Sequence, residues 1–273
     1  MVQNHLGSAV LAIMDSMSQS RRFTARPMGP RYLCVLYLLM LALSAGLAAQ
    51  PIARMDAASA TGGPRVQAGK LIVIGFLGGR VHATNLVHRE AQLVGLLQQA
   101  YPLTIHAAIF ANSDGDAALK AVLDLLDVDR NGHLSDIEKS AARIVIYGHS
   151  WGASEAVTLA GRLDKLGIPV LLTIQVDSVQ KPDQNDRQIP PNVREAINYY
   201  QSEGLLRGRS LIVAADPAKT RILGNRESSY RRNPISVAGF PWYARAFMRR
   251  HIQIENDPQV WNQIEALIVA RLF

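Results

Sequence analysis

One stretch decides the fold, Ile144-Val145-Ile146-Tyr147-Gly148-His149-Ser150-Trp151-Gly152. Its β-branched first half predicts a buried strand, and residues 153–165 follow with helical spacing. The G-x-S-x-G pattern between them predicts a sharp strand-to-helix turn with Ser150 at its apex. Small residues are required two positions on either side of Ser150, because the strand and helix backbones nearly touch at such a turn. The Ser150 hydroxyl is therefore expected to project above the edge of a sheet.

Strands and helices alternate along the rest of the chain. Apolar runs predict strands over 71–75, 103–110, 143–147, 169–176 and 210–215. Helical spacing predicts helices over 88–100, 116–126, 151–165, 193–202, 244–250 and 259–273. Strands as apolar as these are buried on both faces, which is typical of a parallel sheet covered by helices. We therefore predict an α/β fold with a mostly parallel sheet and helices on both of its faces.

Composition excludes some classes of protein. The chain has 273 residues, of which 48% are hydrophobic and 19% charged, and this balance is typical of a folded protein with a substantial core. The formal net charge is +7, without a block of Lys and Arg of the kind that binds nucleic acid. We therefore expect no nucleic-acid partner.

The N-terminal region differs from the rest of the chain. Residues 32–49 carry no charge, follow several arginines and end in small residues. This pattern predicts an export signal that is removed, or a membrane anchor, since a run of this length barely spans a bilayer. We divide the chain into a signal or anchor over 1–49, a linker over 50–68 and a folded domain over 69–273. The expected location is periplasmic or secreted, with a membrane-anchored protein as the alternative.

A serine hydroxyl is a weak nucleophile unless a base takes its proton. In folds that carry this turn, the acid and then the histidine follow the serine along the chain. His251 is the histidine that follows both acid candidates, Asp177 and Asp216. Each of these aspartates ends a predicted strand, where catalytic groups gather in open α/β sheets. We favour Asp177 as the acid and keep Asp216 as the second choice.

Negative charge that develops on a substrate oxygen is stabilised by backbone N–H groups aimed at it. Trp151, directly after Ser150, is expected to supply one of these groups. The second is expected from the loop after the first strand, at Phe76 or Leu77. The two glycines that follow Leu77 let a substrate approach the backbone closely.

Together these segments resemble the α/β-hydrolase superfamily, in its lipase- or esterase-like form. The resemblance covers roughly residues 69–273 and rests on Gly75-Phe76-Leu77-Gly78-Gly79, Gly148-His149-Ser150-Trp151-Gly152, the strand-end Asp177 and His251-Ile252-Gln253-Ile254-Glu255-Asn256-Asp257-Pro258. It implies a serine hydrolase that cleaves a small or lipid-like carboxylic ester or thioester without an organic cofactor. In the implied mechanism Ser150 attacks the carbonyl, His251 moves the proton and Asp177 orients the imidazole.

A second motif matches the EF-hand calcium loop at every diagnostic position, Asp127-Val128-Asp129-Arg130-Asn131-Gly132-His133-Leu134-Ser135-Asp136-Ile137-Glu138. The expected ligands are a water held by Ser135, the His133 carbonyl and the side chains of Asp127, Asp129, Asn131 and Glu138. The loop precedes the strand that leads to Ser150, roughly 20 Å from the serine at about 3.3 Å per strand residue. We therefore expect a structural Ca²⁺ that does not touch the substrate.

Other functions fit the same residues. A chain that has this fold without catalysis would be a calcium-braced module that binds a partner or ligand. Among enzymes, a thioesterase or an acyltransferase is the alternative to an esterase. Covalent labelling by a fluorophosphonate that depends on Ser150 separates an enzyme from a non-catalytic module.

Overall fold

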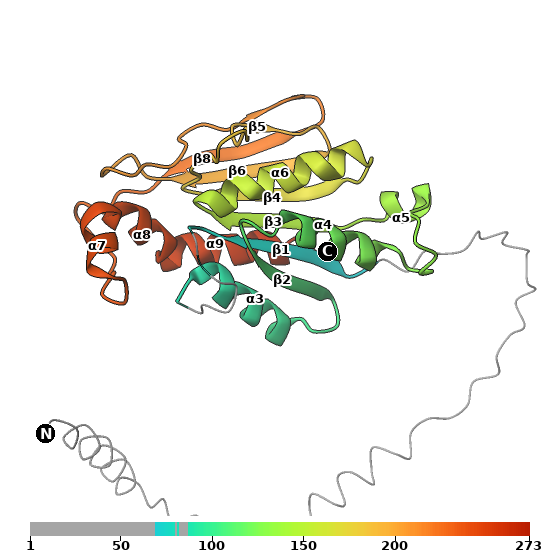
Figure 1. Ribbon diagram of the computed structural model, residues 1–273, viewed down its shortest axis with the longest axis horizontal. Coiled ribbons are helices and arrows are strands. Elements are labelled where there is room, and N and C mark those ends of the chain that lie inside the picture. Colours follow the sequence, from blue (N-terminus) through green and yellow to red (C-terminus); the bar gives the residue numbers. More distant parts are fainter. Residues whose placement is uncertain (1–68, 80, 82–86) are drawn as a thin grey trace, which may run out of the picture. The chain divides into compact units, whose positions relative to one another are not determined.

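A central parallel sheet organises the domain. The computed structural model describes residues 69–79, 81 and 87–273, which contain a six-stranded sheet of order β2-β1-β3-β4-β6-β8 (Figure 1). Every neighbouring pair of strands in this sheet runs parallel. The strands are β1 (Leu71–Leu77), β2 (Ile105–Ala111), β3 (Ile144–His149), β4 (Val170–Val176), β6 (Val193–Tyr200) and β8 (Arg221–Glu227).

Helices cover both faces of this sheet. The helices α3 (Arg89–Ala100) and α9 (Pro258–Val269) share one buried cluster with the strands, and α4 (Gly115–Leu126) and α6 (Trp151–Lys165) share the other. The predicted α/β architecture is thus confirmed for the domain. The shorter helices are α5 (Asp136–Ser140), α7 (Trp242–Phe247) and α8 (Arg249–Glu255). The signal or anchor and the linker predicted over 1–68 lie outside the described residues.

Side chains of β1 contribute to both layers of the core. Leu71 and Val73 belong to the cluster with α3 and α9, whereas Ile72 and Ile74 belong to the cluster with α4 and α6. All of these side chains are buried. Full burial of such a side chain contributes about 1.5–3 kcal/mol to folding. The central strands therefore anchor the domain and hold their carboxyl ends in place.

The carboxyl ends of β3 and β4 meet at one edge of the sheet. In the register of the two strands, His149 lies beside Val176. The residues that follow them in the chain are Ser150 and Asp177, so both emerge at this edge. The backbone N–H of Ser150 donates a hydrogen bond to the Val176 carbonyl at 2.9 Å, which ties the two strand ends together.

The prediction of a helix over 193–202 is wrong, because β6 occupies most of this stretch. The strand lies between β4 and β8 and buries Val193, Ile197 and Tyr199. The Glu and Ala residues within it favour a helix only weakly, and pairing on both sides outweighs that local preference. The sequence does not predict β8, since Arg, Gly and Asn interrupt its apolar pattern at the edge of the sheet.

The strand predicted over 210–215 is shorter than expected and lies outside the main sheet. It contracts to β7 (Val213–Ala214), which pairs with β5 (Gln188–Ile189) in a separate two-stranded sheet. Asp216 therefore follows a strand of this small sheet. Asp216 was chosen as a candidate acid because it was expected to end a strand of the main sheet. The structure shows that it does not.

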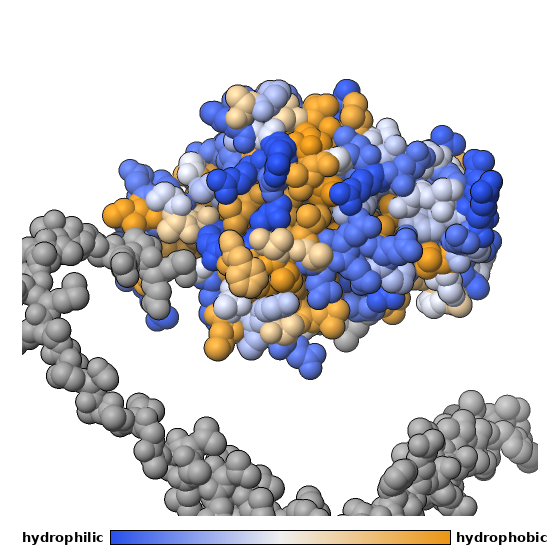
Figure 2. Space-filling view, turned by 180° about the vertical axis from the view of Figure 1, so that it is seen from behind, coloured by the Kyte–Doolittle hydropathy of each residue, from blue (hydrophilic) through white to orange (hydrophobic). Residues whose placement is uncertain are grey.

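The surface of the domain is uneven in hydropathy. Figure 2 shows the molecule from behind, with hydrophobic residues across the middle of the domain and hydrophilic residues on both sides. Trp242, Tyr243 and Phe247 of α7 are large apolar side chains that are exposed. Within 69–79, 81 and 87–273, no helix has the length and hydropathy needed to cross a membrane.

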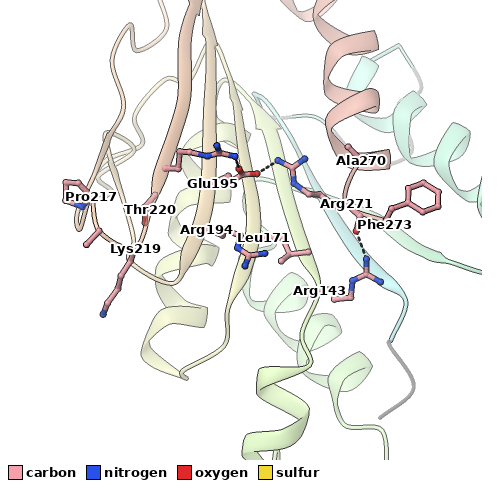
Figure 3. A pocket seen from close by; sticks show the side chains of 12 residues that line it. Arg143, Leu171, Arg194, Glu195, Pro217, Lys219, Thr220, Ala270, Arg271 and Phe273 are labelled. Carbon is pink, nitrogen blue, oxygen red and sulfur yellow. Dashed lines mark hydrogen bonds and ion pairs between the residues drawn. The ribbon is translucent and has the colours of Figure 1, made fainter. Parts of the chain in front are cut away.

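A basic cavity of about 660 Å³ lies at the amino ends of the strands, opposite the edge that carries Ser150. Glu195 of β6 accepts hydrogen bonds there from Arg221 of β8 and from Arg271 near the end of the chain (Figure 3). Arg143 donates to the carbonyl of Leu272 at 3.0 Å. These contacts fasten the edge strand and the C-terminal segment to the centre of the sheet.

Replacing Glu195 with glutamine is expected to lower the free energy of unfolding by about 1–2 kcal/mol near pH 7. Burial opposes ionisation of Glu195, but the hydrogen bond from Arg221 and the charge of Arg271 lower the pKa of its carboxyl below the ordinary value of 4.5. A lowered pKa stabilises the fold above pH 4.5, and this contribution is lost as the pH falls through the lowered value. Urea unfolding at several pH values checks this; a difference between wild type and variant that persists in acid contradicts it.

Candidate active site

The turn after β3 holds Ser150 in an unusual backbone conformation. Ser150 has φ 56° and ψ −125°, and a positive φ costs on the order of 1–3 kcal/mol for a residue with a side chain. A Cβ atom added at Gly152 would lie 2.3 Å from the Phe76 carbonyl oxygen, and one added at Gly148 would lie 2.3 Å from the Gly152 carbonyl oxygen. The backbones of β1, β3 and α6 therefore touch, which confirms the predicted strand–turn–helix arrangement and the need for glycine beside it.

His251 reaches the same edge of the sheet from α8. Its Nδ1 lies 2.6 Å from Oδ2 of Asp177, and both side chains are buried. Because a carboxylate only accepts hydrogen bonds, Nδ1 carries a proton in this pair, which leaves Nε2 as the ring nitrogen that can act as a base. Within the part of the chain that the structure describes, Nε2 of His251 has no hydrogen-bond partner. The imidazole is therefore able to accept a proton at Nε2.

The carboxylate of Asp177 is fixed by further hydrogen bonds. Its Oδ1 accepts from the backbone N–H groups of Gln201 at 3.1 Å and of Gly208 at 2.9 Å. Its Oδ2 accepts from Nε2 of Gln201 at 2.9 Å in addition to His251. The sequence does not predict Gln201 or Gly208, which lie in an irregular loop after β6 and match no motif. These contacts leave the carboxylate one orientation toward the imidazole.

Asp216, the second candidate acid, lies in a different environment. Its carboxylate accepts a hydrogen bond from the backbone N–H of Ala218 at 3.0 Å and lies 3.9 Å from Nζ of Lys219. Its side chain is 39% exposed. The structure thus brings Asp177 to His251 and leaves Asp216 in a solvated turn.

The residues predicted to supply N–H donors lie at the start of α6 and at the end of β1. Trp151 is the first residue of α6, so its backbone N–H is among those that a helix leaves unpaired at its N-terminus. Phe76 and Leu77 are the last residues of β1. Gly78 is the next residue in the chain and lies against Ser150. A Cβ added to Gly78 would lie 2.9 Å from Cβ of Ser150. The end of β1 and the start of α6 therefore enclose the serine side chain.

Ser150 and His251 line a cavity of about 740 Å³. This volume lies within the range of about 300–1,000 Å³ that is usual for small-molecule sites. Apolar side chains form much of the wall, among them Val179, Leu206, Phe240, Met248 and Ile252. A polar reacting group at the serine and an apolar chain along these walls would both be accommodated.

A second set of ionisable side chains, called here the His/Glu cluster, consists of His88, Glu90, His149 and Glu255. Nδ1 of His149 lies 3.6 Å from Oε1 of Glu90 and 3.7 Å from Oε2 of Glu255. Nδ1 of His88 lies 2.5 Å from Oε1 of Glu255. The His149 and His251 rings are 4.4 Å apart between centroids, so the cluster adjoins the imidazole that is bound to Asp177. The sequence does not predict the cluster, because its members come from three distant segments.

Burial controls the charges of the His/Glu cluster. It raises the pKa of Glu90 to about 8, together with the nearby charge of Glu255. It also lowers the pKa of His149 well below its ordinary value, and the charges of His251 and His88 add to this effect. At His88 burial is the largest single cause and acts in the same sense, but the hydrogen bond to Glu255 and the charges of Glu255 and Glu90 together outweigh it and raise the pKa above 6.5. His149 is therefore neutral beside His251, and His88 forms a part-buried ion pair with Glu255.

The residues of the predicted calcium loop lie before β3, from the end of α4 into the first turn of α5. Carboxylate oxygens of Asp127, Asp129 and Glu138 lie within 4.8 Å of one another. The side-chain oxygen of Asn131 accepts from the backbone N–H of His133 at 2.7 Å, and Asp129 accepts from the Asn131 amide at 2.8 Å. The loop thus gathers the oxygen groups that a hard cation prefers.

Two of the predicted calcium ligands also stabilise the start of α5. The Ser135 hydroxyl accepts from the backbone N–H of Glu138, and Glu138 accepts in return from the Ser135 N–H at 2.9 Å. The other oxygen of Glu138 accepts from the backbone N–H of Val128 at 2.9 Å. Burial plays little part at this exposed group, and hydrogen bonds from Ser135 lower the pKa of Glu138. The carboxylate is therefore ionised and tied across the loop.

The sheet, the turn at Ser150 and the Asp177–His251 pair are together consistent with the α/β-hydrolase fold. Solved structures with distant similarity include human thioesterase 2, with a TM-score of 0.39 and 10% identity over 75% of this chain and 96% of that chain. The RedJ thioesterase from Streptomyces coelicolor gives a TM-score of 0.37 and 9% identity over 92% of this chain and 99% of that chain. The ester hydrolase EH1AB1, from the metagenome of Lake Arreo, gives a TM-score of 0.26 and 13% identity over 64% of this chain and 60% of that chain.

These likenesses are too distant to assign an activity. No protein-family profile matches the chain, and no curated protein sequence matches it significantly. The function has to be inferred from the site itself.

Proposed function

We propose that this protein is a serine hydrolase that cleaves a carboxylic ester or thioester through Ser150, His251 and Asp177. The observation that supports this function best is the state of His251. Its Nδ1 is held by Asp177, its Nε2 has no partner in the described part of the chain, and the residue lines a cavity that Ser150 also lines. A base oriented in this way is what a serine hydroxyl needs in order to act as a nucleophile.

The proposed reaction transfers an acyl group first to the serine and then to water. Ser150 Oγ attacks the carbonyl carbon while His251 Nε2 takes its proton, and the carbonyl oxygen becomes negative. The N–H of Trp151, with a second N–H at Phe76 or Leu77, stabilises that oxygen. His251 then gives the proton to the departing alcohol or thiol, and the acyl group stays on Ser150. Water repeats the sequence and releases the carboxylic acid.

The surroundings of the imidazole suit this proton transfer. When His251 takes the proton it becomes positively charged, and the Asp177 carboxylate stabilises that charge. The adjacent ring of His149 is neutral because burial lowers its pKa, so it adds no repulsion.

The apolar walls of the cavity favour an acyl chain as the part of the substrate that is bound. Substrates with one acyl chain can be offered both as p-nitrophenyl esters and as coenzyme A thioesters, from acetyl upward in length. We expect kcat/KM to rise by about fourfold for each added methylene, corresponding to about 0.8 kcal/mol, until the chain fills the cavity. The preferred leaving group separates an esterase from a thioesterase, and ester products formed with an added alcohol reveal an acyltransferase. If the folded protein turns over none of these substrates, the non-catalytic module is the better interpretation.

We further propose that residues 127–138 bind one structural Ca²⁺. The support is the convergence of three carboxylates in a loop with EF-hand spacing. At a Ca²⁺ concentration of 100 times Kd, binding adds about 2.7 kcal/mol of stability. For a domain of this size that raises Tm by about 5–10 °C.

The variant Glu138→Gln is expected to lose this calcium-dependent rise in Tm, because glutamine cannot supply a bidentate charged ligand. Asp136→Asn is the matched control, since it removes a neighbouring carboxylate that is not an expected ligand. Thermal unfolding with Ca²⁺ and with a chelator measures both. Loss of activity in Glu138→Gln at unchanged stability would show that the loop acts in catalysis and is not a brace.

A further inference from the structure

We propose that the His/Glu cluster, formed by His88, Glu90, His149 and Glu255, binds one divalent transition-metal ion of the zinc class. None of its residues belongs to the calcium loop. His88, His149 and Glu255 line the same cavity as Ser150. The mechanism proposed for Ser150 uses none of its carboxylates.

The positions of the donor atoms suit one small cation. One donor atom each of His88, Glu90 and Glu255 lies within 4.8 Å of the others. Nδ1 of His149 lies 3.6 and 3.7 Å from oxygens of the two glutamates. Nitrogen and oxygen ligands about 2.0–2.1 Å from a tetrahedral zinc are about 3.3 Å apart, so small side-chain movements bring these atoms into place.

The contact of 2.5 Å between His88 and Glu255 is closer than two ligands of one ion can be. It is a hydrogen bond that needs a shared proton. A metal ion displaces this proton, and the two groups then separate to bind the ion. Metal binding at this site is therefore expected to release a proton, as is usual for histidine ligands.

Burial supplies an independent reason to place a cation here. Glu90 is fully buried, and among the described residues neither of its carboxylate oxygens makes a hydrogen bond of ordinary geometry, although the backbone N–H groups of Glu90 and Gly78 lie near enough to lower its pKa. A buried carboxyl group without well-placed partners is costly, whether or not it is ionised. A divalent cation would balance both carboxylates and give the Glu90 oxygens a partner.

The chemistry of the donors selects the class of metal. Two imidazole nitrogens and two carboxylate oxygens suit Zn²⁺ and related transition metals, whereas Ca²⁺ and Mg²⁺ prefer sites made of oxygen alone. The chain therefore offers two separable cation sites, a nitrogen–oxygen site at the cavity and the all-oxygen loop over 127–138.

Calorimetric titration of the chelator-treated full chain with Zn²⁺ tests the proposal, with Co²⁺ as a spectroscopic probe. We expect one tight Zn²⁺ per chain, a rise in Tm, and the visible absorption of tetrahedral Co²⁺. Glu90→Gln should weaken Zn²⁺ binding by roughly 100-fold and still fold, because glutamine has nearly the same shape as glutamate and needs no buried charge. His88→Asn, at a partly exposed position, is a second variant that should also weaken it.

Two controls separate this site from other metal binding. His133→Asn removes an exposed histidine of the calcium loop, and Glu138→Gln removes a calcium ligand; neither should change the Zn²⁺ titration. Zn²⁺ binding that is equally strong in Glu90→Gln and His88→Asn would overturn the proposal, as would a folded wild type that binds no Zn²⁺. In that case a proton shared by Glu90 and its neighbours balances the cluster. The readouts do not depend on turnover, so they stand apart from the test of the hydrolase.

Discussion

Ser150→Ala is expected to lower kcat for ester or thioester hydrolysis by on the order of a million-fold. Alanine lacks the oxygen that forms the acyl intermediate, and the neighbouring Nε2 of His251 then has no hydroxyl to activate. Residual turnover of on the order of 10³–10⁴ over the uncatalysed rate is expected from the remaining N–H donors and substrate binding. Stopped and continuous assays with a chromogenic ester measure both rates.

The fold should tolerate this change. Alanine accepts the same positive φ at the turn at a similar cost, so Tm should be nearly unchanged. Ser113→Ala, at an exposed serine after β2, is the control for serine removal and should keep full activity. Retention of wild-type kcat in Ser150→Ala would show that another group is the nucleophile.

Asp177→Asn is expected to lower kcat by about 10⁴-fold with KM little changed. The asparagine amide donates to Nδ1 of His251 where the carboxylate accepted, which moves the imidazole proton to Nε2. The imidazole then has no lone pair to receive the serine proton. Steady-state kinetics give kcat and KM separately, and near-ultraviolet circular dichroism verifies that the buried site still packs.

Asp216→Asn is the matched control for Asp177→Asn. Asp216 is partly exposed and bonds only to its own turn, so this variant should keep the activity of the wild type. The opposite pattern, with Asp216→Asn inactive and Asp177→Asn active, would reverse the choice of acid. The sequence favoured Asp177 without excluding Asp216, and these two variants decide between them.

Local pattern was sufficient for the parts of the fold that are strongly apolar. Runs such as Leu71–Leu77 and Val170–Val176 are buried on both faces and read directly as strands. The turn at Ser150 was predictable as well, because only glycine fits where the backbones on either side of the serine nearly touch. The α/β architecture follows from these segments, because alternating strands and helices leave few other ways to bury them.

The rest depends on contacts between distant segments. Residues 193–200 form a strand because they pair with β4 on one side and β8 on the other. Their local sequence does not predict this pairing. The hydrogen bonds of Gln201 and Gly208 to Asp177 join two loops that are distant in the sequence. The His/Glu cluster is likewise assembled from separate segments, and His149 could be read only as the variable position of the serine motif.

Peptide mass spectrometry after treatment with a fluorophosphonate decides whether Ser150 is the nucleophile. We expect one adduct per chain, on the peptide that contains Ser150, formed by the folded protein and lost in His251→Ala. An adduct on a different residue, or no adduct on a protein that is demonstrably folded, would contradict the proposed hydrolase.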